Sequence, residues 1–209
     1  MSVDANTRRE ELVSVFREAA ICTRCALCES RTQVVFGAGN ANADLMFVGE
    51  APGAEEDRQG LPFVGRSGAL LTTLLADVGI SRDDVFITNT IKCRPPGNRD
   101  PASAEIESCR PWLYEQIRLI EPRVVATLGN FATRLLSGDP TGITKVHGKP
   151  QLKRLGSRTV QLLPLFHPAA ALRATGTRQL LAADLANLPG LLLQEVPELA
   201  PEGAIGEPL

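Results

Sequence analysis

Four short apolar runs constrain the fold of this chain more than any other feature of its sequence. Each run has the length and the composition of a strand that is buried on both faces. The four runs are Leu45–Val48, Val85–Thr88, Val124–Leu128 and Val160–Phe166. Three stretches with helical spacing lie between them, at Ser67–Val78, Ser103–Ile120 and Asn130–Leu136. This alternation predicts an α/β fold, a three-layer α/β/α sandwich around a mostly parallel sheet of four strands.

The two ends of the chain differ from this central part. Residues 5–21 carry apolar side chains at helical spacing and predict an amphipathic helix, and 179–193 predicts a last helix that is broken or kinked at Pro189. The segment 194–209 has three prolines, two glycines and four glutamates without periodicity. We therefore expect one folded domain over residues 1–193 and a disordered acidic tail over 194–209.

Composition and charge exclude several classes of protein. Lys and Arg together number 22 and Asp and Glu 24, which gives a net charge of −2 and excludes a histone-like polycation. No apolar run approaches the ~18 residues that a membrane span needs. The N-terminal residues are polar and charged, so we expect no signal peptide and a cytoplasmic protein. In that compartment five cysteines favour metal or cluster ligation over disulfides.

The cysteines form a clustered triplet and a distant pair. Cys22, Cys25 and Cys28 are separated by two-residue gaps, and Cys93 and Cys109 follow 16 positions apart. Two-residue gaps allow neighbouring thiolates to reach one metal or cluster, and the distant pair would close the site. Four ligands are needed, so one cysteine is spare. The spacing is compatible with both Zn²⁺ and an iron–sulfur cluster.

Three of the apolar runs are followed by groups suited to binding a polar heterocycle. Glu50, Asn89 and His167 follow the first, second and fourth runs. Ligands of parallel α/β sheets bind beyond the carboxyl ends of the strands, so these three side chains are expected to converge. Phe63 lies in a loop between Gly60 and Gly65, where its ring could stack on a flat ligand. The alternatives are that Asn89 is a turn residue, that His167 with the following proline belongs to an ordinary loop, and that Phe63 is tucked beneath its loop.

Two charged segments allow more than one interpretation. Glu50, Glu55, Glu56 and Asp57 could bind Mg²⁺, but we prefer the interpretation that Glu55–Asp57 is a solvated run beside a short helix start. Between Pro140 and Ala183 there is no acidic residue. Seven cations occur there: Lys145, Lys149, Lys153, Arg154, Arg158, Arg173 and Arg178. Such a stretch is typical of a nucleic-acid-binding face, and the alternative is an ordinary solvated surface. No phosphate-binding glycine motif is present, which argues against nucleotide triphosphate hydrolysis.

Three motifs resemble those of a known family. They read GEAPGAEEDRQGLPFVGRSG, NTIKCRPPGN and HPAAALR, with a CxxC upstream. Together they are similar to the family 4 uracil-DNA glycosylases of bacteria and archaea, and the resemblance covers roughly residues 20–193. It implies a base-excision repair enzyme that flips uracil out of DNA and hydrolyses the N-glycosidic bond, leaving an abasic site. It also implies a [4Fe-4S] cluster bound by Cys22, Cys25, Cys93 and Cys109, with Cys28 as the spare.

The resemblance also implies a role for each residue of the pocket. The end of the first strand contributes Gly49, Glu50, Ala51 and Gly53. Phe63 stacks on the flipped base, Asn89 reads uracil O4 and N3–H, and His167 is the catalytic donor to O2. Family 1 glycosylases have an aspartate at the position of Ala51, so here the water is positioned by Glu50, a backbone carbonyl or the substrate phosphate. They have a thymine-excluding tyrosine at the position of Gly53, so the sequence leaves open how thymine is rejected. Our candidates for DNA contacts are Leu172 as a wedge, Arg173 and Lys149.

The expected partner is uracil-containing DNA, single- or double-stranded, with no membrane association and with the protein acting as a monomer. Two other functions are possible for such a chain. One is a non-catalytic or covalently trapping uracil-DNA binding protein; cross-linking relatives carry a KRRIH insertion after the second motif, where this chain has RPPGNRDP. The other is a cluster-bearing module of a replication or repair complex with a vestigial pocket. Intact Glu50, Phe63, Asn89 and His167 disfavour it.

Overall fold

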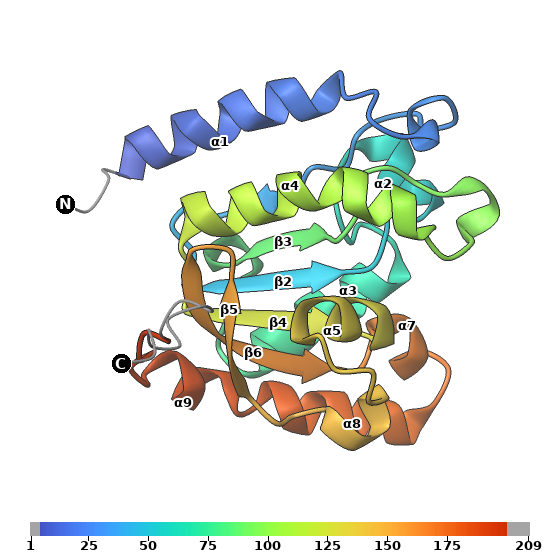
Figure 1. The fold of residues 1–209 in the computed structure, drawn as a ribbon. Helices are drawn as coiled ribbons and strands as arrows, with labels where there is room; N and C mark the ends of the chain where they lie inside the picture. Colours follow the sequence, from blue (N-terminus) through green and yellow to red (C-terminus); the bar gives the residue numbers. More distant parts are fainter. Residues whose placement is uncertain (1–4, 200–209) are drawn as a thin grey trace, which may run out of the picture.

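A computed structural model of the protein describes residues 5–199, which fold around one sheet with the strand order β1-β3-β2-β4-β6-β5 (Figure 1). The strands are β1 (Ala38–Gly39), β2 (Leu45–Gly49), β3 (Phe86–Asn89), β4 (Val124–Leu128), β5 (Gln151–Leu155) and β6 (Arg158–Leu165). The four inner strands β3, β2, β4 and β6 run parallel, so their carboxyl ends lie at the same edge of the sheet. The two outer strands pair antiparallel to their neighbours.

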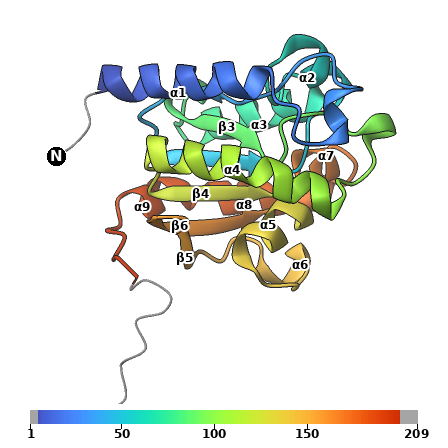
Figure 2. The same ribbon diagram turned by 45° about the horizontal axis from the view of Figure 1, so that its top comes forward.

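Helices cover both faces of this sheet. They are α1 (Ala5–Ala20), α2 (Ala54–Gln59), α3 (Arg66–Asp77), α4 (Ser103–Ile120), α5 (Asn130–Ser137), α6 (Ile143–Val146), α7 (Pro168–Ala171), α8 (Thr175–Leu185) and α9 (Leu188–Leu192). Helices α1, α4 and α5 pack on one face, and α3, α8 and α9 pack on the other (Figure 2). Three short 3₁₀ helices occupy Ala26–Cys28, Arg82–Asp84 and Pro96–Asn98. The predicted α/β/α sandwich is confirmed.

Each face has its own apolar core. Leu113 and Ile117 of α4 are buried on one side, and Leu71 and Leu75 of α3 on the other, all with at most 1% of their surface exposed. Complete burial of such a side chain stabilises the folded state by about 1.5–3 kcal/mol. The inner strands are buried on both faces, which is why they appear in the sequence as continuous apolar runs.

The expectation of four strands was wrong, because the sheet has six among the described residues. Strand β1 has only two residues, one of them glycine, and three of the five residues of the edge strand β5 are polar or charged. Neither forms an apolar run.

The predicted last helix is also divided earlier than expected, between Leu185 and Leu188. Pro189 lies in the first turn of α9, where its missing N–H breaks no helical hydrogen bond.

The first part of the predicted tail contacts the sheet. Gln194 to Leu199 form no helix or strand, but the Leu199 N–H donates to Thr159 Oγ1 (3.0 Å) and the Arg123 guanidinium donates to the Gln194 carbonyl (2.6 Å). The predicted tail at 200–209 lies outside the described residues and stays a prediction. Within residues 5–199, no helix is both long enough and apolar enough to cross a membrane.

Candidate active site

A cleft of about 700 Å³ opens at the carboxyl ends of the inner strands. Six of the predicted pocket residues line it: Glu50, Ala51, Gly53, Phe63, Asn89 and His167. They come from the end of β2, the loop before α3, the end of β3 and the segment after β6. The predicted convergence of acid, amide and imidazole at one edge of the sheet therefore occurs.

Asn89 ends β3 opposite Gly49 of β2, and only 2% of its surface is exposed. Its side-chain amide makes no hydrogen bond to any other residue of the described part of the chain, so it does not stabilise a turn there. A Cβ atom on Gly49 would overlap Asn89 Oδ1 and lie 2.8 Å from Phe63 Cζ. Glycine at position 49 thus allows the amide and the ring to approach each other at the base of the cleft.

Phe63 is held in a constrained position. Its backbone has a φ of +51°, in the left-handed region that costs a residue with a side chain roughly 1–2 kcal/mol. A Cβ on Gly68 would overlap the Phe63 carbonyl oxygen, so this close contact requires glycine at the start of α3. The Phe63 ring is 7% exposed, and its centroid lies 5.8 Å from that of the His167 ring. The ring is thus packed beneath its loop and also lines the cleft.

His167 precedes α7 as its N-cap residue. Its Nδ1 accepts a hydrogen bond from the Ala169 N–H at 3.1 Å, which assigns the ring proton of the neutral imidazole to Nε2. Burial lowers the pKa of His167 to about 4, with the nearby Glu56 carboxylate opposing the shift. At neutral pH the residue is therefore an uncharged imidazole whose available group is one N–H donor.

The acidic residues near the cleft have different surroundings. Burial, followed by repulsion from Asp100, raises the pKa of Glu50, whose carboxylate makes no hydrogen bond within residues 5–199. Glu56 Oε1 accepts from the N–H groups of Val64 and Gly65, both at 3.2 Å, and so stabilises the loop that carries Phe63. A raised pKa brings the Glu50 carboxylate nearer to the range useful for a general base.

The expectation of a solvated run at Glu55–Asp57 was partly wrong. Glu55 is exposed and pairs with Arg58 at 2.7 Å. Asp57, however, is 4% exposed and accepts hydrogen bonds from the Thr32 N–H at 3.0 and 3.2 Å. Its burial is possible because a backbone donor from a segment 25 residues earlier satisfies the carboxylate.

Several cleft residues were not predicted. Asn98, Arg99 and Asp100 line the cleft, and Asp100 also lines a second hollow beside it, together with Glu50, His167 and Arg134. The loop carrying residues 98–100 follows β3, and a segment that leaves the carboxyl end of a parallel strand starts at the ligand-binding edge. This position in the chain was the signal that could have identified them.

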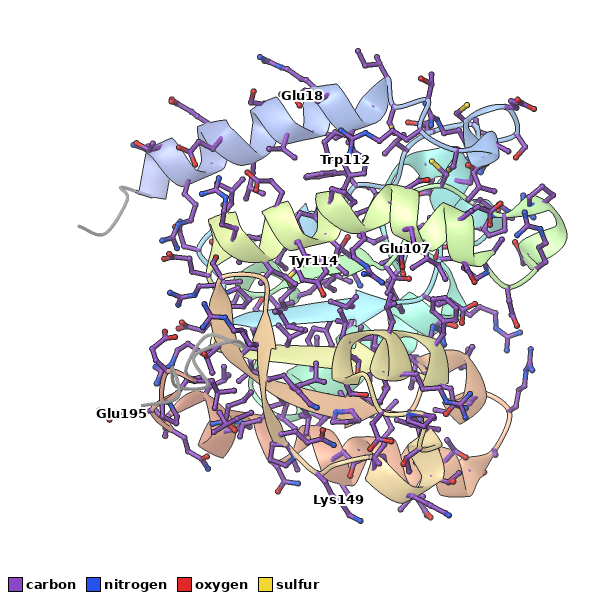
Figure 3. All side chains as sticks on the ribbon, in the orientation of Figure 1. Glu18, Glu107, Trp112, Tyr114, Lys149 and Glu195 are labelled. Atoms are coloured by element: carbon purple, nitrogen blue, oxygen red, sulfur yellow. The ribbon has the colours of Figure 1, made fainter. Side chains whose placement is uncertain are left out.

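The predicted DNA contacts are spread over different parts of the surface. Arg173 lines the cleft, and Leu172 beside it is 40% exposed at the end of α7. Lys149 projects into solvent beyond α6 and is not among the cleft residues (Figure 3). Arg154 and Arg158 belong to the β5–β6 hairpin, where they contact the Leu199 carbonyl and Glu121. The cationic stretch 140–183 therefore does not form one continuous face at the cleft.

A separate small hollow lies where the end of α1 meets α4. Its lining includes four cysteines, Cys22, Cys25, Cys93 and Cys109, whereas Cys28 is not part of it. Trp112 projects from α4 toward α1 (Figure 3), and the Arg24 guanidinium lies 4.2 Å above its ring. No three His, Cys, Asp or Glu side chains in the described residues converge closely enough to hold a single metal ion.

The thiols around this hollow have hydrogen-bond donors directed at them. The Lys92 peptide N–H donates to Cys109 Sγ at 3.2 Å, and the Arg31 guanidinium donates to Cys93 Sγ at 3.4 Å. Burial raises the pKa of the Cys109 thiol to about 11 and also raises the pKa values of Cys25 and Cys93. Four thiols around one hollow, two of them with N–H donors, form a donor set that fits an iron–sulfur cluster.

Comparison with known proteins agrees with this geometry. The family model of the uracil DNA glycosylase superfamily matches residues 36–188. A Type-4 uracil-DNA glycosylase of Sulfurisphaera tokodaii is 41% identical, over 88% of this chain and 86% of the relative. Similar enzymes of Archaeoglobus fulgidus and Thermotoga maritima are 40% and 43% identical, over 91% and 90% of this chain and 98% of each relative. The chain belongs to the uracil DNA glycosylase superfamily and, within it, to the Type-4 family.

The buried neutral His167 predicts a specific pH dependence of stability. The unfolded chain takes up a proton on this imidazole near pH 6.5, whereas the folded protein does so only near pH 4. The unfolded state therefore binds more protons in this window, and the free energy of unfolding falls as the pH is lowered from about 6.5 to about 4. The contribution of His167 reaches roughly 3 kcal/mol at the lower end.

This contribution is measured by comparing urea unfolding of wild-type and His167→Gln protein at several pH values. The variant should show a flatter dependence between pH 6.5 and 4, because glutamine does not titrate. Parallel curves for the two proteins would show that His167 titrates normally in the fold.

Proposed function

We propose that this protein is a DNA repair glycosylase that flips uracil out of single- or double-stranded DNA and hydrolyses its N-glycosidic bond. The observation that carries this proposal is the convergence of an aromatic ring, an unpaired amide and a neutral imidazole donor in one cleft, through Phe63, Asn89 and His167. Membership of the Type-4 family supports it. The enzyme acts as a cytoplasmic monomer.

Recognition of the base follows from the groups at the bottom of the cleft. Flipping a base costs a few kcal/mol of lost stacking, which the Phe63 ring partly replaces. The Asn89 amide offers one donor for uracil O4 and one acceptor for N3–H, and no other described residue competes for these groups. Cytosine presents a donor at N4 and no proton at N3, so it does not match this pattern.

Chemistry proceeds by departure of the base and addition of water. The bond between C1′ and N1 breaks with its electron pair going to uracil, and negative charge develops on O2. The Nε2–H of His167 donates to this oxygen, and the buried surroundings strengthen the interaction. Glu50 orients the attacking water and accepts its proton as the oxygen bonds to C1′. Ala51 has no polar side chain for this task.

The DNA strand lies along the cleft with Arg173 beside it and with Leu172 entering the stack that the flipped base has left. Lys149 contributes a phosphate contact farther from the cleft.

Phosphate contacts release counterions, so the affinity for uracil-free oligonucleotide should fall steeply as salt rises. Charge reversal at Arg173 should reduce the slope of this dependence.

The test of the proposed function is excision itself. Purified protein is incubated with labelled single- and double-stranded oligonucleotides containing one uracil, and abasic sites are then cleaved with alkali. Release of free uracil with an alkali-labile strand is expected. A stable covalent adduct would indicate the trapping function, and tight binding without release would indicate a non-catalytic protein.

The side chain of Asn89 should determine which base is excised. In Asn89→Asp, an ionised carboxylate repels uracil O4 but can accept from cytosine N4–H₂, as acids do in the major groove. The variant should lose most uracil excision and gain weak cytosine excision, more at mildly acidic pH, where a protonated carboxyl can donate to cytosine N3. Product release from matched single strands across pH measures both. Undiminished uracil excision would show that the base is read elsewhere.

Cys22, Cys25, Cys93 and Cys109 would hold a [4Fe-4S] cluster in the cysteine-lined hollow. Bound there, the cluster would supply a structural cross-link between the end of α1, the loop after β3 and α4. The N–H donors at Cys93 and Cys109 suit thiolate sulfurs that carry negative charge. None of the four cysteines lines the active-site cleft, so we expect the cluster to contribute to stability rather than to the chemical step.

Two cysteine variants test this ligand set. Cys93→Ala should lose the broad visible absorption of the purified protein and lower its solubility and melting temperature. Cys28→Ala, the matched control, should retain all three. Iron and acid-labile sulfide are quantified in both. Stoichiometric zinc in colourless wild-type protein would refute the iron–sulfur assignment, and loss of the cluster in Cys28→Ala would refute the chosen ligands.

A further inference from the structure

A buried ammonium group lies directly behind the base-reading residue. Lys92 has 1% of its surface exposed, and its Nζ donates to Thr88 Oγ1 (2.6 Å), the Asn89 carbonyl oxygen (2.8 Å) and Gln116 Oε1 (2.6 Å). The Thr88 hydroxyl gives its own proton to the Phe36 carbonyl at 2.7 Å, so toward Lys92 it acts as an acceptor. Each of the three N–H groups of the Lys92 ammonium therefore has an acceptor, so all of its hydrogen-bond donors are satisfied.

These contacts restrain the point at which the chain leaves the sheet. Asn89 is the last residue of β3, and its carbonyl group points away from the ladder toward Lys92. The three acceptors of Lys92, from Thr88, Asn89 and Gln116, form a cage around its ammonium group. Gln116 of α4 also donates to the Phe36 carbonyl at 2.7 Å, which connects this cage to the helix layer. On the other side, the Thr90 N–H donates to the Gly49 carbonyl at 2.9 Å. The backbone of Asn89 is thus held from both directions.

An apolar side chain would fill this space without the cost of burying a charge. Taking an ammonium group out of water is unfavourable unless every proton is bonded, and an apolar replacement of similar volume is often at least as stable. A simple filler of the core therefore needs no lysine at this position. The directed bond to the Asn89 carbonyl is what an apolar side chain could not provide.

We propose that Lys92 is a positioning residue for base recognition, which holds the main chain of Asn89 so that its amide meets the edge of the flipped uracil. The inference rests on the proposed function and deepens it. Lys92 does not line the cleft and touches no substrate, so its effect on base recognition is exerted through Asn89. Lys92 also lines the cysteine hollow, and visible absorption of its variants reports separately on any effect there.

The experiment is a double-mutant cycle between Lys92→Met and Asn89→Ala, measured by single-turnover excision from a uracil-containing single strand. Misplacement of a recognition group by about 1 Å can cost up to 10²-fold, so Lys92→Met alone should slow excision by roughly 10- to 100-fold. In the Asn89→Ala background the same change should have almost no further effect. Affinity for uracil-free DNA should stay at the wild-type value.

Two further variants keep the result interpretable. Thr88→Val removes one acceptor of the cage with little change in shape, so it should give a smaller loss that also disappears in the Asn89→Ala background. If Lys92→Met does not fold, Thr88→Val takes its place in the double-mutant cycle. Arg17→Met, which removes an exposed cation on α1, is the matched control for loss of charge and should excise at the wild-type rate. Melting curves and visible absorption report on folding.

Two outcomes would overturn the inference: full excision activity in Lys92→Met, or a loss that is equally large with and without the Asn89 amide. The second would mean that Lys92 acts on the fold as a whole or on the reaction by another route. Failure of the proposed function would look different, because wild-type protein would then release no uracil at all.

Discussion

The site depends on the close approach of the ends of β2 and β3 at Gly49. The hydrogen-bond ladder between these strands continues past their ends, from the Thr90 N–H to the Gly49 carbonyl (2.9 Å) and from the Ile91 N–H to the Glu50 carbonyl (3.2 Å). Because Gly49 has no Cβ, the Asn89 amide and the Phe63 ring can both occupy the space above it. Any side chain at this position would displace both groups from the cleft.

Burial lowers the pKa of two ionisable groups near this point, His167 and Lys92, but their hydrogen-bond partners favour different charge states. His167 has an N–H donor facing Nδ1 and no acceptor for a second proton there, so the uncharged ring suits its surroundings. Burial lowers the pKa of Lys92 to about 7 as well, but all three of its neighbours are acceptors and bind the protonated form. The partners of each group, rather than burial alone, determine the charge that the fold accommodates.

Much of this arrangement could be predicted from the sequence because it depends on local patterns. Buried parallel strands leave apolar runs, and the residues directly after them, such as Glu50, Asn89 and His167, must lie at one edge of the sheet. The edge strands β1 and β5 leave no such run. The burial of Asp57 and Lys92 depends on partners far along the chain, Thr32 and Gln116, so no local pattern distinguishes them from solvated charges.

The central claim is that the neutral imidazole of His167 stabilises the departing base, and single-turnover excision by His167→Ala tests it most directly. The matched control is His147→Ala, which removes the chain's other histidine, paired with Asp184 outside the cleft. Loss of one donor to a developing anion should slow excision by about 10²- to 10³-fold in His167→Ala alone, with DNA affinity unchanged. An unaltered rate in His167→Ala would contradict the account.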